Sequence, residues 1–349
     1  MLQFLNKDDA LRPTTKDLAK AAGVSRATVD RVLNGREGVN PKTVEKVNAA
    51  IVEIGFLRNI AAANLAKSRT YRFLFVLPQS GDQFLDEILR HVAEAETAFA
   101  ADMVLTNVHH IDENDPHAIA AFLGSLTCDA VDGVAIMAPE TPQVRDAIAR
   151  LQERGVHTLP FISNQTLTDH NCVGIDNYAA GATAGTLMGR FLPQRPGKLL
   201  VIADSIQSRH TLERRSGFDT AINGNFPHLT ALPTLETYGS DQRAGTIIPA
   251  AMQRQPDIVG IYVFASEARV PLQIIARAGA PQGAVVIAHE RTPSTLAALT
   301  DGTLDAVITQ DSGHLVRSAV RKLRALTDMR VTLKSQEKIR IEILLKTNI

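Results

Sequence analysis

The sequence predicts a small all-α helix-turn-helix headpiece followed by an α/β body of two doubly wound parallel-sheet lobes. Residues 16–34 spell a helix, a tight turn and a second helix with a polar outer face, and from Arg72 onward short apolar runs alternate with amphipathic segments. The charges divide at the same place: residues 1–72 hold 13 Lys and Arg against 7 Asp and Glu, and the rest of the chain holds 24 against 30. A basic N-terminal region of this kind indicates contact with phosphates.

The first helix and the turn follow from short-range signals. Leu18, Ala19 and Ala22 give the helix one apolar face, and Gly23 can take the left-handed conformation that ends it. Ser25 is then suited to cap a second helix. We therefore expect a sharp helix-turn-helix. An ordinary helical hairpin with a solvated basic face is the alternative interpretation.

The second helix separates an inner face from an outer face. Val29, Val32 and Leu33 recur at helical spacing and should point inward. The outward side chains are Arg26, Ala27, Asp30 and Arg31. A guanidinium reads guanine through two hydrogen bonds and an alanine can touch a thymine methyl group, so the two arginines and the alanine are predicted base contacts. The predicted phosphate anchors are Thr15, Ser25, Thr28 and Asn34.

A third helix and a short Ala-rich segment complete the N-terminal region. Pro41 opens the third helix, whose apolar positions keep helical spacing, and Gly55 ends it. The Ala-rich helix predicted within residues 56–68 is too short to be stable alone, so something else must order it. The predicted domains are a headpiece at 12–57, a hinge helix and linker at 58–71, and a body at 72–349.

Residues 15–68 resemble the DNA-binding headpiece and hinge helix of the lactose-repressor (LacI/GalR) family of bacterial transcription regulators. The resemblance implies that the helix after the turn reads the major groove, and that the hinge helices of two subunits enter the minor groove at the operator centre. Leu65 matches the family's leucine that wedges a base step open, Ala62 lies one turn before it, and Asn59 matches the hinge asparagine. Unstacking a base step costs about a few kcal/mol, which the gained contacts offset.

Two residues depart from the family pattern. Arg58 stands where the family usually has proline. The arginine adds a phosphate contact, but the rigid helix start that proline provides is lost. Asp30 stands where the family usually has serine. Its carboxylate would lie near phosphates, unless it accepts a hydrogen bond from a cytosine amino group or orients Arg26 or Arg31. We expect an unusual operator.

The body reads as alternating strands and helices. The predicted strands are 73–77, 103–108, 131–137, 156–162, 199–203, 258–264, 284–288 and 305–308. The predicted helices are 85–100, 116–126, 143–154, 178–192, 211–222, 243–253 and 315–326. This is the order of doubly wound α/β sheets, and the strands are too numerous for one sheet of five or six. Ligands of such sheets bind beyond the carboxyl ends of the strands.

The body, from about Arg72 to the end, resembles the periplasmic-binding-protein-like effector-binding and dimerisation domain of the same family. The segments that carry the resemblance are 131–134, 174–177, 213–218, 289–290 and 305–311. It implies that the chain crosses between the lobes three times, near Asp176, Thr309 and Asp328, and that a ligand lies between the lobes.

The expected effector site combines residues at strand ends with two that match the family. Arg214 precedes Gly217 by three residues, as the family's effector-contacting arginine does, and Glu290 takes the place of an acidic residue that binds sugar hydroxyls. The predicted effector-binding residues are Gln79, Asp82, Gln83, Phe84, Asn164, Asp176, Arg214, Ser266, His289 and Glu290. Such a set suits a neutral polyhydroxylated ligand, a sugar or sugar derivative. Because the chain has no tryptophan, the stacking ring would be Phe84, Phe161, Phe264 or His289.

The partners follow from the two ends of the chain. Residues 338–345 alternate with period two, which predicts a strand and therefore a homodimer without a tetramerising coiled coil. A two-fold dimer should bind double-stranded DNA at a near-palindromic operator. Residues 1–9 lack the pattern of a signal peptide and no apolar run reaches the length of a membrane span, so we expect a cytoplasmic protein that contacts no membrane.

Two other classes of protein are less consistent with the sequence. An enzyme is disfavoured because there is no Gly-x-Ser-x-Gly and no phosphate-binding loop, and we expect no cofactor and no metal: Cys128 and Cys172 lack metal-ligand spacing, and residues 109–112 read as a solvated loop. A sugar-binding transport receptor would fit the body, but the headpiece opposes it. The sequence thus predicts a ligand-responsive transcriptional repressor, with induction and corepression both open.

Overall fold

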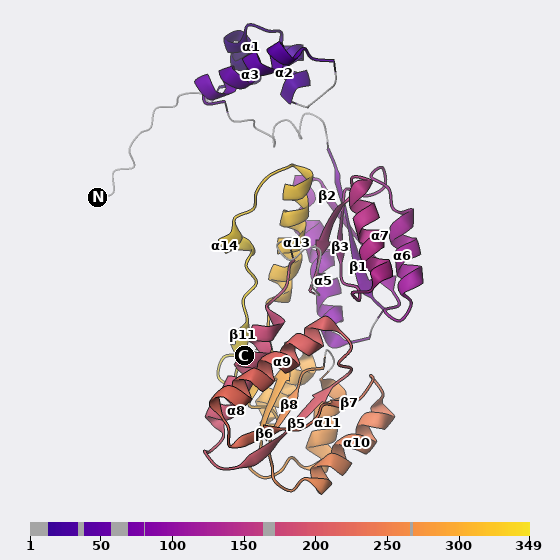
Figure 1. Ribbon diagram of the computed structural model, residues 1–349, viewed down its shortest axis with the longest axis vertical. Coiled ribbons are helices and arrows are strands. Elements are labelled where there is room, and N and C mark those ends of the chain that lie inside the picture. Colours follow the sequence, from indigo (N-terminus) through magenta and orange to yellow (C-terminus); the bar gives the residue numbers. More distant parts are fainter. Residues whose placement is uncertain (1–12, 34–37, 57–68, 80, 163–171, 266–267) are drawn as a thin grey trace, which may run out of the picture. The chain divides into compact units, whose positions relative to one another are not determined.

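The computed structural model describes residues 13–33, 38–56, 69–79, 81–162, 172–265 and 268–349. It divides into two compact units, Met1–Arg69 and Thr70–Ile349, each with its own hydrophobic core (Figure 1). In the described part of the chain, no helix combines the length and the hydrophobicity needed to cross a bilayer.

The first unit contains the three predicted helices, α1 (Thr15–Ala22), α2 (Arg26–Leu33) and α3 (Pro41–Glu53). Its core is small and fully enclosed at the centre, where Leu18 of α1, Val29 of α2 and Val47 of α3 are each 0% exposed. Each of these helices is too short to be stable alone, so their mutual burial of apolar side chains holds the headpiece together.

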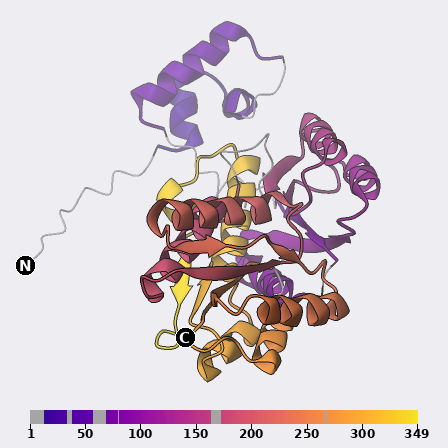
Figure 2. The same ribbon diagram turned by 60° about the horizontal axis from the view of Figure 1, so that its bottom comes forward.

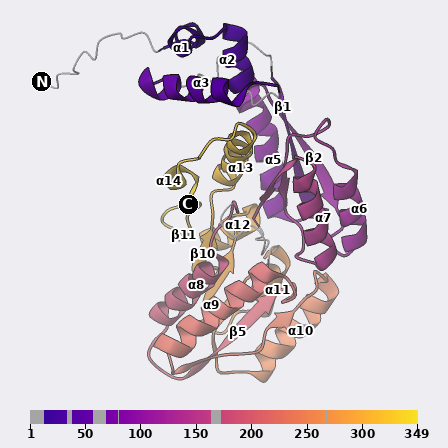
Figure 3. The ribbon, with the colours of Figure 1, turned by 45° about the horizontal axis from the view of Figure 1, so that its top comes forward.

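The second unit begins with a four-stranded parallel sheet in the order β2-β1-β3-β4. Its strands are β1 (Tyr71–Pro78), β2 (Val104–Ile111), β3 (Gly133–Ile136) and β4 (His157–Pro160). Helices α6 (Pro116–Ser125) and α7 (Pro142–Glu153) cover one face, and α5 (Gln83–Ala98) and α13 (Ser312–Thr327) cover the other (Figure 3). A 3-10 helix, η1 (Ala100–Asp102), leads into β2. We call this sheet and its helices the first lobe.

The second lobe is built on a sheet in the order β11-β10-β9-β8-β5-β6, with β7 also paired to β5. The strands are β5 (Gly197–Ala203), β6 (Leu229–Ala231), β7 (Leu235–Glu236), β8 (Ile258–Val263), β9 (Val285–His289), β10 (Ala306–Thr309) and β11 (Glu342–Leu344). All pairs are parallel except β11 with β10. The predicted C-terminal strand is therefore confirmed over β11.

Two helix layers enclose this second sheet (Figure 2). Helices α8 (Asn177–Phe191) and α9 (Arg209–Asn225) pack on one face. The other face is covered by α10 (Asp241–Arg254), α11 (Arg269–Ala278) and α12 (Pro293–Asp301). The fold class predicted from the sequence, an all-α headpiece followed by two parallel α/β lobes, is confirmed.

The chain passes between the sheets at three places in the sequence. It leaves the first sheet after β4 and enters α8, returns from β10 to α13, and runs from α13 through α14 (Lys334–Glu337) to β11. The return at residues 309–312 is short, and Asp311 caps α13 by accepting a hydrogen bond from the backbone N–H of His314 at 2.7 Å.

Candidate functional sites

The turn between α1 and α2 has the geometry that the sequence predicts. Gly23 has φ +65° and its N–H donates to the last carbonyls of α1, at Ala19 and Lys20. The Ser25 hydroxyl oxygen accepts a hydrogen bond from the N–H of Thr28 at 3.0 Å, so it caps α2. A second cap was not predicted: Thr14 and Asp17 form a reciprocal capping box at the start of α1.

The outer face of α2 is open to solvent. Val29 is fully buried and Val32 and Leu33 are half-buried, whereas the four outward residues predicted from the sequence are all exposed. Arg26 has no hydrogen-bond or ion-pair partner among the described residues. Arg31 lies against the following loop, with its Nη2 3.3 Å from the position that a Cβ on Gly38 would take. The two arginines therefore differ in their surroundings.

The predicted phosphate anchors are placed at helix starts. Thr15 is half-buried in the first turn of α1, and the hydroxyl groups of Ser25 and Thr28 lie 2.8 Å apart at the start of α2. Helix N-termini direct backbone N–H groups outward, which favours anions. Six predicted site residues lie outside the described residues: Asn34, Asn59, Ala62, Leu65, Asn164 and Ser266.

In the second lobe, Arg214 joins two residues that are distant in sequence. Its side chain is 5% exposed; Nε donates to Oδ1 of Asn177 at 2.9 Å, and Nη2 donates to Oε1 of Glu290 at 2.7 Å. The Glu290 side chain is 3% exposed. A buried ion pair of this kind holds its geometry because losing either partner would leave an uncompensated buried charge.

Close contact between α8 and α9 brings Arg214 to this position. A Cβ on Gly181 would lie 1.9 Å from the carbonyl oxygen of Arg214, and a Cβ on Gly217 would lie 2.0 Å from that of Tyr178. Only glycine permits the backbones to approach so closely. The start of α8 is fixed by Asp176, whose carboxylate accepts a hydrogen bond from the N–H of Ala179 at 2.9 Å.

Glu290 follows β9 in an unusual backbone conformation. Its φ is +63°, a left-handed value that is rare for a residue other than glycine. Two backbone hydrogen bonds hold it there: its N–H donates to Ile308 at 2.9 Å, and its carbonyl accepts from the Thr295 hydroxyl at 2.8 Å. The surrounding structure thus fixes the direction of the Glu290 carboxylate.

Three buried polar atoms near the carboxyl ends of β9 and β10 have no hydrogen-bond partner among the described residues. They are Nδ1 of His289, Oε2 of Glu290 and Oε1 of Gln310, in residues that are each at most 3% exposed. A buried polar group without a partner costs about 1–3 kcal/mol. Such atoms indicate a place where a ligand or water completes the hydrogen bonds.

Burial keeps the histidines of this region neutral. Burial, together with the Arg214 charge, lowers the pKa of His289 well below its ordinary value and lowers the pKa of His210 to about 3. Nε2 of His289 lies 2.7 Å from the hydroxyl oxygen of Tyr262, whose pKa burial raises. The Tyr262 ring stacks on Phe218 with 4.4 Å between ring centroids.

The first-lobe residues predicted for the effector site have other contacts in the structure. Asp82 caps α5 by accepting from the N–H of Leu85 at 2.6 Å, and Oε1 of Gln83 accepts from the N–H of Ser294 in the second lobe at 3.2 Å. Gln79, which follows β1, is exposed. Phe84 is 4% exposed and packs in the core of the first lobe. The rings of Phe161 and Phe264 are likewise enclosed in the core.

Charged side chains connect and border the lobes. Nη1 of Arg209 lies 3.4 Å from Oε2 of Glu140, and this ion pair joins the second lobe to the first.

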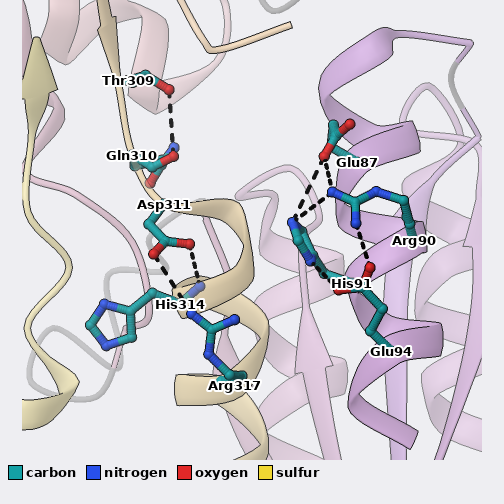
Figure 4. Close-up of polar contacts among 9 residues, drawn as sticks. All are labelled: Glu87, Arg90, His91, Glu94, Thr309, Gln310, Asp311, His314 and Arg317. Carbon is teal, nitrogen blue, oxygen red and sulfur yellow. Dashed lines mark hydrogen bonds and ion pairs between the residues drawn. The ribbon is translucent and has the colours of Figure 1, made fainter. Parts of the chain in front are cut away.

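On the first lobe, α5 carries the charged cluster Glu87, Arg90, His91 and Glu94 beside the start of α13 (Figure 4). A Cβ on Gly313 would lie 3.2 Å from Cε1 of His91, so the chain returning from β10 packs tightly on α5.

Several residues of the second-lobe site were not predicted from the sequence. Asn177 and Gln310 lie within segments that carry the family resemblance. Gln310 lies two residues after the predicted strand at 305–308 and directly after β10, so its position at a strand end could have indicated it. Tyr262 lies inside β8, and no local signal distinguishes it from a core residue.

Two family models match the chain. The model of the bacterial regulatory proteins of the lacI family matches residues 14–59, and the periplasmic binding protein domain model matches residues 73–329. The first coincides with α1 to α3 and the second with both lobes.

Two bacterial transcriptional regulators are similar in sequence to parts of the chain. The HTH-type transcriptional regulator RegA of Clostridium saccharobutylicum is 37% identical over 136 residues, 39% of this chain and 39% of RegA. The HTH-type transcriptional repressor PurR of Pectobacterium carotovorum subsp. carotovorum is 31% identical over 199 residues, 57% of this chain and 56% of PurR. The chain therefore spans about two fifths of RegA and just over half of PurR.

Solved structures share the fold of the body. GanP, a glucose-galactose binding protein from Geobacillus stearothermophilus, has a TM-score of 0.68 at 16% identity and covers 80% of this chain and 99% of its own. An ABC transporter solute binding protein from Burkholderia graminis, in complex with D-arabinose, has a TM-score of 0.68 at 21% identity, covering 80% and 96%. With a lacI-family DNA-binding region at residues 14–59 followed by a periplasmic binding protein domain at residues 73–329, the chain belongs to the periplasmic binding protein domain family and carries a lacI-family headpiece.

Proposed function

We propose that the chain is a sequence-specific DNA-binding transcriptional repressor whose operator affinity is controlled by a small polar effector bound between the two lobes. The main support for this proposal is the exposed, basic outer face of α2. A serine cap and a fully buried Val29 fix this helix, while Arg26, Ala27 and Arg31 remain exposed. A short helix with guanidinium groups on its outer face suits the major groove.

Phosphate contacts would come from the rest of the headpiece. Exposed lysines occur on α1 and α3, namely Lys16, Lys20, Lys42 and Lys46. Their attraction to DNA is independent of sequence and weakens steeply with salt, because binding releases counterions. The acidic body adds no such attraction.

We propose a neutral, hydroxyl-rich effector, most simply a carbohydrate. Glu290 already balances the charge of Arg214, and the unpartnered oxygens of Glu290 and Gln310 require hydrogen-bond donors. Sugar hydroxyls supply such donors. Structural neighbours that bind glucose, galactose or arabinose support the proposal. Asp176, His289, Asp82, Gln79 and Gln83 stay candidate contacts, though some already serve as caps or bridges.

Control of DNA binding would follow from linkage. An effector that binds one lobe arrangement better than another shifts the protein toward or away from the conformation that binds DNA. The coupling free energy between two such sites is about 1–3 kcal/mol in typical systems. We further propose a cytoplasmic homodimer, whose two headpieces would bind the half-sites of a near-palindromic operator.

The test is selection of DNA ligands from a random duplex library by the full-length protein, followed by a sugar panel on the enriched sequence. Enrichment of a near-palindrome is the expected result, and one sugar should change its dissociation constant at least fivefold. Absence of any enriched sequence, with and without the panel, would contradict the proposal and favour a binding protein that reads no DNA.

A further inference from the structure

Helix α13 runs from the ligand-site end of the second lobe to the start of β1. It begins just after β10, where the unpartnered Oε1 of Gln310 lies, and Asp311 caps its first turn. It ends beside Tyr71, the first residue of β1, which follows the segment that joins the headpiece to the body (Figure 1). At 1.5 Å per residue, its 16 residues span about 24 Å. The two ends of α13 therefore lie at the two places that effector control has to connect.

A buried hydrogen bond joins the C-terminal end of α13 to β1. The hydroxyl of Tyr71 donates to Oδ1 of Asp328 at 2.7 Å, and Asp328 is the C-cap residue of α13. Tyr71 is 1% exposed and the Asp328 side chain is 2% exposed. Nη2 of Arg330 lies 3.5 Å from the other carboxylate oxygen. A hydrogen bond to a buried carboxylate is strong, so the start of β1 is held to the end of the helix.

The same end of α13 is also tied to the segment that leads into β2. The guanidinium carbon of Arg324 lies 5.4 Å from the centroid of the Tyr71 ring, and Nη1 is 2.9 Å from Oδ1 of Asp102 in η1. The N–H of Tyr71 donates to the carbonyl of Met103, the residue after η1, at 2.8 Å. Tyr71 thus contacts both α13 and the start of the neighbouring strand.

Two of the three passages between the sheets adjoin α13. One is the return from β10 at its start. The other runs through α14 to β11, and there Glu337 accepts a hydrogen bond from Nε of Arg321 on α13 at 2.8 Å. A rearrangement of the lobes would therefore act on this helix. A packed helix moves as a unit, so a displacement at one end reaches the other.

We propose that the hydrogen bond between Tyr71 and Asp328 couples the arrangement of the two lobes to the segment that carries the headpiece. The inference rests on the proposed function, in which an effector between the lobes controls operator affinity. An effector bound beside Gln310 favours one position of α13, and Asp328 passes that position to Tyr71. Tyr71 is a positioning residue, because it acts through the helix and the chain that precedes β1.

The experiment measures the operator dissociation constant of the full-length protein with and without the sugar that changes wild-type affinity most in the panel. Tyr71→Phe removes the hydroxyl and keeps the buried ring. Tyr238→Phe removes a hydroxyl from a residue that is 57% exposed and is the matched control. Asp328→Asn keeps an oxygen that can accept from Tyr71 and is the conservative variant. Calorimetry measures the sugar affinity of each protein, and circular dichroism establishes that each is folded.

The sugar should change the operator dissociation constant of wild type at least about fivefold, and that of Tyr71→Phe less than about twofold. Sugar affinity without DNA, and operator affinity without sugar, should stay within about twofold of wild type in Tyr71→Phe. Tyr238→Phe and Asp328→Asn should respond as wild type does. Because coupling is reciprocal, operator DNA should change the sugar affinity of wild type and leave that of Tyr71→Phe nearly unchanged.

A full sugar response in Tyr71→Phe would overturn this inference alone and leave the proposed function standing. A weakened response that came with an equal loss of sugar affinity would also overturn it, since the hydroxyl would then support the ligand site itself. If Tyr71→Phe does not fold, the double variant with Asp328→Asn removes the buried charge and takes its place. If no sugar changed the operator affinity of wild type, the proposed effector control would fail and this inference with it.

Discussion

The headpiece and the second-lobe site place their functional groups in opposite ways. In the headpiece the candidate DNA contacts are exposed and lie within one eight-residue helix, α2. In the second lobe the residues grouped around Arg214 are buried and come from α8, α9 and the ends of β9 and β10. A local surface can be altered without changing the fold, whereas a buried convergent site depends on the packing of everything around it.

The largest expected effect concerns the small core of the headpiece. Leu18→Ala removes a side chain that is 0% exposed, which costs about 2–5 kcal/mol. A core this small supplies about that much stability, so the headpiece should unfold and DNA binding should disappear. Calorimetry of the full-length variant should show the body transition unchanged. The control is Val52→Ala, because the Val52 side chain is 83% exposed. A shift of the body transition in Leu18→Ala would contradict the independence of the two units.

A smaller effect is expected where α8 meets α9. Gly217→Ala places a Cβ 2.0 Å from the carbonyl oxygen of Tyr178, so the helices must separate at a cost of about 1–3 kcal/mol. Gly224→Ala on the same helix meets nothing within 4 Å and should be neutral or stabilising by up to about 1 kcal/mol. Chemical unfolding of the body measures both. Equal stabilities of the two variants would show that the close contact is not required.

The pH dependence of stability should separate the two units. The first 72 residues contain no histidine, whereas burial holds the pKa of His210 and His289 in the body below their ordinary values. The unfolded chain therefore binds protons below about pH 6.5 that the folded body does not bind. Body stability is full above that pH and falls as the pH is lowered, by about 1.4 kcal/mol per pH unit for each such histidine.

Calorimetry between pH 7 and pH 5 provides the measurement. The body transition should move to lower temperature while the headpiece transition stays nearly constant. His289→Asn should flatten the slope of the body, and an unchanged slope in that variant would assign the dependence to other groups.

The smallest effect is expected for the ion pair between the lobes. The side chain of Arg209 is 36% exposed, so Glu140→Gln should change stability by only about 0.2–1 kcal/mol. Asp146→Asn, which breaks an exposed pair with Arg150 within the first lobe, is the control. Urea unfolding of both variants should agree closely, and a loss of more than about 2 kcal/mol in Glu140→Gln alone would make this pair a principal link between the lobes.

The same contrast explains what could be predicted from the sequence. The turn at Gly23 and the cap at Ser25 depend on neighbours within a few residues, so their geometry could be predicted. Apolar runs likewise located the principal strands. The strands β6 and β7 have only three and two residues and leave no periodicity to detect.

The second-lobe site was predicted only in part because it depends on distant contacts. Arg214 and Glu290 were expected from family resemblance, but that they bind each other follows only from the packing that Gly181 and Gly217 permit. The burial of Phe84 could not be predicted, because its position after a strand does not tell which way the first turn of the next helix faces.

The most direct test of the account is the operator dissociation constant with and without the sugar found in the panel, for wild type and for Glu290→Gln. Glutamine keeps an acceptor for Arg214 but leaves its buried charge uncompensated, so circular dichroism must first establish that the variant is folded. The sugar should change the operator dissociation constant of wild type at least about fivefold and leave that of the variant nearly unchanged, while both proteins bind the operator equally well without sugar. A full effector ratio in Glu290→Gln would contradict the assignment of the buried Arg214–Glu290 pair to effector sensing.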